Sequence, residues 1–161
     1  MPDNPIRLES NNRFERLDFA NESLAVLFDH LHSFRSDHGL AGELSLAFLT
    51  DTELASIHAE FLADPNPTDV ITFPGEGTDG LAGEICVSVE RAEIEAVARG
   101  ESFARELTLY LVHGWLHLVG FDDMEDADRV LMREAERESM GTIEKAGLIP
   151  DFRLAPKSLA E

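Results

Sequence analysis

The sequence predicts an α+β domain in which helices surround a small four-stranded mixed sheet. Four short segments have the alternating or β-branched pattern of strands, and longer segments with apolar residues at helical spacing lie between and after them. Two of the strands flank the glycine-containing loop at residues 75–80, which is typical of an antiparallel hairpin. Because no repeat or linker-like segment divides the chain, we expect residues 1–161 to form a single domain.

Each predicted strand follows from a local pattern of apolar residues. The predicted strands are residues 6–9, 43–49, 69–73 and 81–89. The first two alternate apolar and polar or small residues, as half-buried strands do, and the third is rich in β-branched residues. We expect Asn11 and Asn12 to end the first strand.

Each predicted helix combines helical spacing of apolar residues with a start or stop signal. The predicted helices, caps included, are residues 18–38, 50–62, 88–99, 102–120 and 125–140. Thr50 and Glu53 form a capping box, and Ser88 and Ser102 are suitable N-caps for the helices that follow them. We expect the tail from Ile149, residues 149–161, to be loosely held.

Composition limits the classes of function that fit this chain. The net charge of −19 repels phosphate at long range, so any nucleic acid must be bound through local contacts. No apolar run approaches the roughly 20 residues of a membrane span, and the start of the chain lacks the pattern of a signal peptide. We therefore expect a cytoplasmic protein without membrane contacts. The single cysteine, Cys86, lies in an apolar strand and is interpreted as a core residue.

A pair of histidines predicts a metal site. His113 and His117 are four residues apart in a largely apolar run, and an i, i+4 pair projects from one face of a helix. Gly120 ends that run, and Asp122 and Asp123 follow it directly. Such a pair is often only structural. Here, however, unpaired imidazoles among apolar neighbours would need a partner, which a metal ion with a carboxylate ligand would provide.

These motifs and others upstream resemble the bacterial YbeY family of metal-dependent endoribonucleases. The stretch at residues 113–123, HGWLHLVGFDD, is similar to the family signature H-G-x-L-H-L-x-G-[YF]-D-H, and Met132 and Glu136 match its following M-x-x-x-E. Residues 67–74, PTDVITFP, resemble the family's P-T-[ND]-V-[LI]-[ST]-F-P strand, and residues 83–85, GEI, its G-[DE]-I strand. The resemblance covers most of the chain in the right order.

The resemblance implies a fold, an activity and a set of site residues. It implies a four-stranded sheet, one zinc ion per chain, and single-strand-specific cleavage in ribosomal RNA maturation. Ribosomal RNA, and with it the small ribosomal subunit, would be the partner, with no DNA. Matching residue by residue gives His113, His117 and Asp123 as metal ligands that act through the metal, and gives Asp122 a supporting role behind them.

The chain departs from the family pattern at two positions. Asp123 stands where the family has its third metal histidine, and Leu62 stands where the family has an arginine. Arg105, two turns before His113 on the same predicted helix, is a weak substitute for that cation, since helix rise places it about 12 Å away along the axis. A hydrolase of another substrate and a non-catalytic protein with a structural metal are the alternative interpretations.

Overall fold

The computed structural model describes residues 6–34, 40–62, 69–75 and 80–156. Its strands are β1 (Ile6–Asn12), β2 (Leu17–Asp18), β3 (Gly42–Leu49), β4 (Val70–Pro74), β5 (Leu81–Ser88) and β6 (Arg153–Leu154). Its helices are α1 (Asn21–Phe34), α2 (Asp51–Leu62), α3 (Val89–Arg99), α4 (Phe103–Leu118) and α5 (Asp126–Lys145). The predicted α+β class and four-stranded mixed sheet are confirmed.

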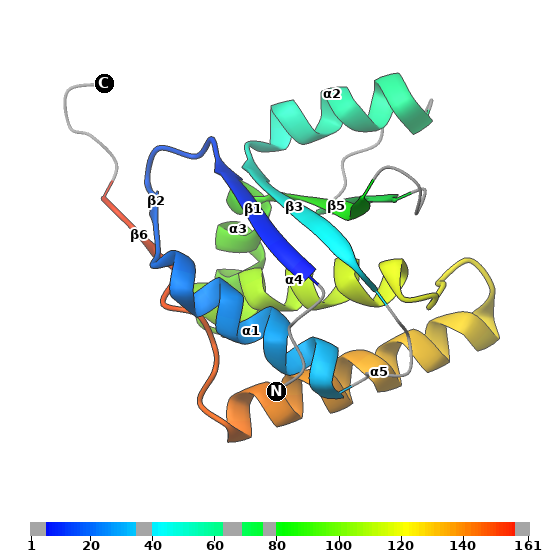
Figure 1. Cartoon of the computed structure of the whole chain (residues 1–161). Coiled ribbons are helices and arrows are strands. Elements are labelled where there is room, and N and C mark those ends of the chain that lie inside the picture. Colours follow the sequence, from blue (N-terminus) through cyan, green and yellow to red (C-terminus); the bar gives the residue numbers. More distant parts are fainter. Residues whose placement is uncertain (1–5, 35–39, 63–68, 76–79, 157–161) are drawn as a thin grey trace.

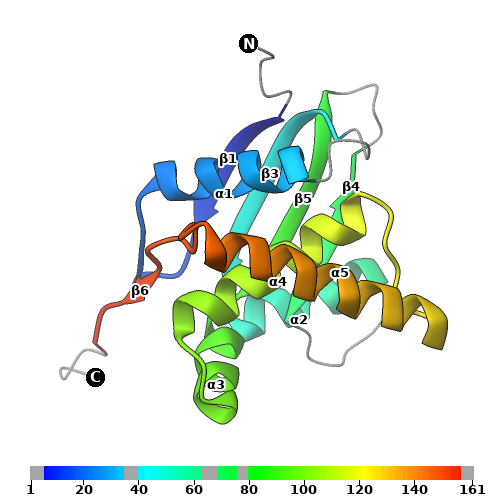
Figure 2. The ribbon, with the colours of Figure 1, turned by 90° about the horizontal axis from the view of Figure 1, so that it is seen from below.

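The sheet has the order β1-β3-β5-β4, with helices on both faces. Strands β1, β3 and β5 are parallel, and β4 is antiparallel to β5, so the predicted hairpin pairing around the 75–80 loop is confirmed. Helix α2 covers one face, while α1, α4 and α5 lie on the other (Figure 1). Seen from that second side, α1, α4 and α5 cross in front of the strands (Figure 2).

Both faces of the central strands are buried because helices cover both. Leu44, Leu46 and Phe48 of β3 point into the large core under α1, α4 and α5. Ala47 and Leu49 of β3 join a smaller core with Leu54 of α2 and Cys86 of β5. Cys86 is therefore a core residue, as predicted, and burial, with the nearby Glu84 charge, raises its pKa to about 12.

The predicted N-terminal caps of three helices are confirmed by side-chain hydrogen bonds. Thr50 Oγ1 accepts a hydrogen bond from the Glu53 amide, and Glu53 Oε1 accepts one from the Thr50 amide. The Ser88 and Ser102 hydroxyls cap α3 and α4 by accepting hydrogen bonds from the Arg91 and Arg105 amides. Within the described ranges, no helix combines the length and apolar composition that a membrane span requires.

Several predicted ends of helices and strands differ from the structure. In each case, contacts with distant parts of the chain decide where the element begins or ends. Strand β1 continues through Asn12 because its register with β3 extends to Phe48. Helix α1 begins at Asn21 because the two residues of β2 pair with β6 instead. Helix α5 continues past Met140 to Lys145, since Ile143 in this last part is fully buried.

The tail is held as far as Ala155, in contrast to the expected loose segment from Ile149. Phe152 is buried in the core, and the Asp151 carboxylate accepts hydrogen bonds from the Ala20 amide and the Ser23 hydroxyl at the start of α1. The residues that hold the tail lie far from it in sequence, so no local pattern in the tail itself predicts this attachment.

Gly114 sets how closely α4 approaches the sheet, which gives a first prediction. A Cβ atom at Gly114 would lie 2.6 Å from Ile85 Cγ2 and 3.2 Å from Thr72 Cγ2. Ile85 is fully buried and branched at Cβ, so it cannot move aside freely. We expect Gly114→Ala to lower the free energy of unfolding by about 1–3 kcal/mol, measured by urea denaturation.

Gly141 of α5 is the matched control for that substitution. A Cβ atom there meets nothing within 4 Å, and its φ lies outside the left-handed region. Gly141→Ala should therefore stabilise the protein by about 0.5–1 kcal/mol through helix propensity alone. Equal stability changes in the two variants would show that the close approach of α4 to the sheet is not a constraint.

Candidate metal centre

Helix α4 and the loop after it bring three potential metal ligands together. His113 and His117 lie in the last two turns of α4, and each side chain is one-quarter exposed. Gly120, with a φ of +112°, reverses the chain, and the Phe121 amide donates to the Leu116 carbonyl to close the helix end. Asp123 is then returned to the histidines.

The distances between the donor atoms fit a single ion. His113 Nε2 and His117 Nε2 are 3.1 Å apart, and each is 3.5 Å from Asp123 Oδ2. Two donors about 2.0–2.1 Å from a tetrahedral zinc ion stand about 3.3 Å apart. Among the described residues, no fourth His, Cys, Asp or Glu joins this group. The three side chains could therefore hold a metal ion and leave a coordination position open.

Two carboxylates support the ligands from behind. Glu136 of α5 lies 2.5 Å from His113 Nδ1, so Nε2 of the same ring faces His117 and Asp123. Asp122 Oδ1 accepts a hydrogen bond from the Asp123 amide at 2.7 Å, which constrains the turn of the loop. A histidine whose second ring nitrogen bonds a carboxylate is the usual arrangement for a metal ligand.

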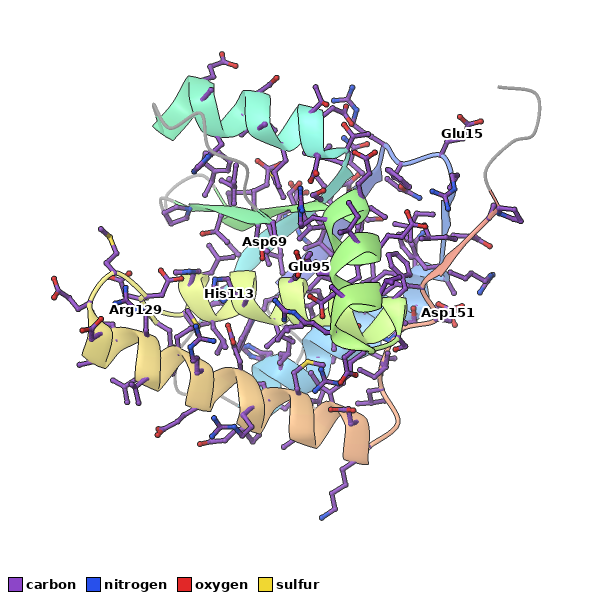
Figure 3. All side chains as sticks on the ribbon, turned by 180° about the vertical axis from the view of Figure 1, so that it is seen from behind. Glu15, Asp69, Glu95, His113, Arg129 and Asp151 are labelled. Atoms are coloured by element: carbon purple, nitrogen blue, oxygen red, sulfur yellow. The ribbon has the colours of Figure 1, made fainter. Side chains whose placement is uncertain are left out.

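The local charges favour a protonated His113 when no metal is bound. Burial lowers the pKa of His113, but the hydrogen bond to Glu136 and the charges of Glu136 and Asp123 outweigh burial, so the net pKa is raised. Asp69, just before β4, contributes in the same direction and lies near His113 in Figure 3. Protons and a metal ion compete for His113, so metal binding here depends on pH.

A cavity of about 100 Å³ opens beside two of the three donors. It is lined by His113, Asp123, Met132, Glu136 and two arginines of α5, Arg129 and Arg133. Figure 3 shows His113 and Arg129 on the two neighbouring helices. The cavity places cationic side chains within reach of any group that approaches the donors.

A model of the family described as endoribonuclease YbeY matches residues 8–144, which is most of the chain. The chain belongs to the YbeY family.

Several YbeY proteins are similar over most of their length. The endoribonuclease YbeY of Carboxydothermus hydrogenoformans is 30% identical over 137 residues, which is 84% of this chain and 96% of that protein. That of Protochlamydia amoebophila is 30% identical over 147 residues, covering 89% and 97%. The solution structure of TM1509 from Thermotoga maritima is 24% identical, covers 89% of this chain and 94% of its own, and superposes with a TM-score of 0.59, so it shares the fold.

The structure brings the predicted YbeY site residues together and excludes Arg105 as a substitute cation. His113, His117 and Asp123 form one group, with Asp122 beside them. Arg105 is not a substitute cation, because its guanidinium lies 3.2 Å from Glu144 and 3.6 Å from Glu101. Leu62 ends α2, and its side chain lies outside the described residues.

Sequence reasoning missed two features of the site. In the sequence, Glu136 stands out only as part of the family-like M-x-x-x-E, and that motif is the available signal for its contact with His113. No pattern pointed to Arg129 or Arg133, which look like ordinary charges on an exposed helix.

The contact between Glu136 and His113 gives a second prediction. Glutamine keeps the size of the side chain but removes the negative charge that orients and polarises the imidazole. We expect Glu136→Gln to weaken metal affinity roughly tenfold or more, measured by competition with a chromophoric chelator.

Glu134, exposed on the same helix, provides the matched control. Glu134→Gln removes the same charge and should leave metal affinity unchanged. Identical affinities for wild type, Glu136→Gln and Glu134→Gln would exclude a supporting role for Glu136.

Proposed function

We propose that this chain is a zinc-dependent endoribonuclease that cleaves single-stranded RNA in ribosomal RNA processing. The observation that supports it most directly is the convergence of His113, His117 and Asp123 beside a cavity, without a fourth ligand among the described residues. Two imidazoles and one carboxylate are a donor set that suits catalytic zinc. Membership of a family whose proteins are named endoribonucleases supports RNA as the substrate.

In this proposal the chain's own residues have distinct roles. His113, His117 and Asp123 hold the ion, Glu136 orients the His113 ring, and Asp122 fixes the turn that carries Asp123. Zinc at this place would supply a Lewis acid for a phosphoryl oxygen and lower the pKa of a water molecule. The quarter-exposed histidines and the open cavity leave room for a phosphodiester to approach from solvent.

The wider setting is part of the same proposal. We take residues 1–161 as one catalytic domain that acts in the cytoplasm on ribosomal RNA, in contact with the small ribosomal subunit, and not on DNA or at a membrane. A non-catalytic protein with a structural metal is less consistent with the site, because structural zinc is usually closed by four protein ligands.

RNA cleavage gives a third prediction. His117→Ala removes one of the three donors, so we expect metal-dependent cleavage of single-stranded RNA to fall to background. The net charge of −19 repels RNA, so moderate salt should first raise the cleavage rate by screening before higher salt weakens local contacts. Initial rates across a salt series for both proteins test this.

His32→Ala, on α1 and away from the site, is the control and should cleave RNA like wild type. Equal residual rates in wild type and His117→Ala would mean a contaminating nuclease. A metal-dependent hydrolase of another substrate, or a binding protein, would then replace the proposed function.

The aspartate at position 123 gives a fourth prediction. Asp123→His replaces an anionic ligand with a neutral one, so the site keeps more positive charge and a metal-bound water would be more acidic. We therefore expect the activity–pH profile to move to lower pH, with bound metal remaining near one per chain. Metal content by elemental analysis and rates between acidic and basic pH are the measurements.

Asp122 is the rival ligand, and alanine variants separate the two carboxylates. Asp123→Ala should lose metal, whereas Asp122→Ala should retain most of it. If the opposite holds, or if Asp123→His retains metal with an unmoved pH profile, Asp123 is not a ligand.

A further inference from the structure

Three arginines form a line along α5 in an otherwise acidic chain. Arg129, Arg133 and Arg137 recur every four residues, so they lie along one face of the helix, about 6 Å apart along its axis. Like charges at this spacing repel one another, and the chain as a whole carries 32 acidic against 13 basic residues. A line of arginines here does not stabilise the helix by itself.

Two of these arginines line the cavity beside the metal ligands, and the third does not. Arg129 and Arg133 share that cavity with His113 and Asp123. Arg137, one helical turn further, is exposed and lies outside the cavity lining. The line of arginines therefore begins at the metal site, with Arg129 and Arg133, and ends in solvent, with Arg137.

The guanidinium of Arg129 already makes hydrogen bonds to the loop that carries Asp123. Its Nη1 donates to the Asp123 carbonyl at 3.4 Å and to the Met124 carbonyl at 3.3 Å. Its carboxylate partner, Asp126, is almost fully exposed, so this ion pair contributes little. Arg129 thus ties the Asp123 loop to α5.

Arg133 is exposed and makes no hydrogen bond or ion pair with the part of the chain that the structure describes. Glu136, three residues on, directs its carboxylate at His113 instead. An unpaired guanidinium at the edge of a cavity that also holds metal donors is free to bind an anion there, and its planar fork suits two phosphate oxygens at once.

We propose that Arg133 binds a phosphate of the RNA next to the bond that is cut, while Arg129 holds the Asp123 loop in place. This rests on the proposed endoribonuclease function. Negative charge builds up on the phosphoryl group during cleavage, and a fixed cation close by stabilises it. Arg105 cannot supply that cation because Glu144 and Glu101 hold it, and position 62 carries an apolar leucine.

The test compares Arg133→Gln with Arg137→Gln, which removes the same charge from the same helix outside the cavity. The probe is a fluorescent single-stranded 2′-O-methyl oligonucleotide, titrated by anisotropy into the zinc-loaded protein across a salt series. Arg133→Gln should bind roughly tenfold more weakly, and the slope of log K against log salt should shift by about +0.7 because one cation–phosphate contact is lost. Arg137→Gln should match wild type in both.

Cleavage of the corresponding RNA and metal content complete the experiment. Arg133→Gln should raise KM and lower kcat with unchanged metal content and melting temperature, and Arg133→Lys should recover part of the loss. If wild type cleaves RNA but Arg133→Gln behaves like Arg137→Gln, the role of Arg133 is overturned and the proposed function stands. If wild type neither binds nor cleaves RNA, both are overturned.

Discussion

The close packing of α4 on the sheet is the constraint on which the rest of the structure depends. Gly114 leaves no space for a side chain between the helix and Ile85 of β5, so the helix backbone rests almost directly on the strand. Leu111 and Trp115 are buried on either side of this contact. Because the apolar faces of α4 are buried in this packing, His113 and His117 lie on the side of the helix that is partly open to solvent.

Helix α5 completes the site because it turns back and packs against α4 (Figure 2). The short turn after Gly120 brings Asp123 back to the two histidines, and Glu136 reaches His113 from 23 residues further along the chain. A half-buried imidazole is costly without a partner, and these carboxylates provide one before any metal binds. The same interactions that raise the pKa of His113 also place its free nitrogen toward the other donors.

The long-range and local electrostatics of this protein have opposite signs. A net charge of −19 attracts divalent cations and opposes RNA, whereas the cavity edge on α5 carries arginines. Repulsion between exposed charges decays over about 10 Å in 0.1 M salt, so a bound strand would be governed by the local cations and the metal. An acidic surface is thus compatible with a phosphate-binding site that is small and specific.

The sequence by itself determined the features that depend only on residues a few positions apart in the chain. Strand alternation, the Thr50–Glu53 capping box, the Ser102 cap and the four-residue spacing of the histidines are local, and the structure confirms each of them. Tertiary structure decided the rest. The β2–β6 pairing joins Asp18 and Arg153 across 135 positions, and Glu136 is chemically identical to the solvated glutamates beside it on α5. Apart from the family-like M-x-x-x-E motif, only the packing of α5 against α4 distinguishes it, because contacts between residues so far apart in sequence leave no periodic pattern.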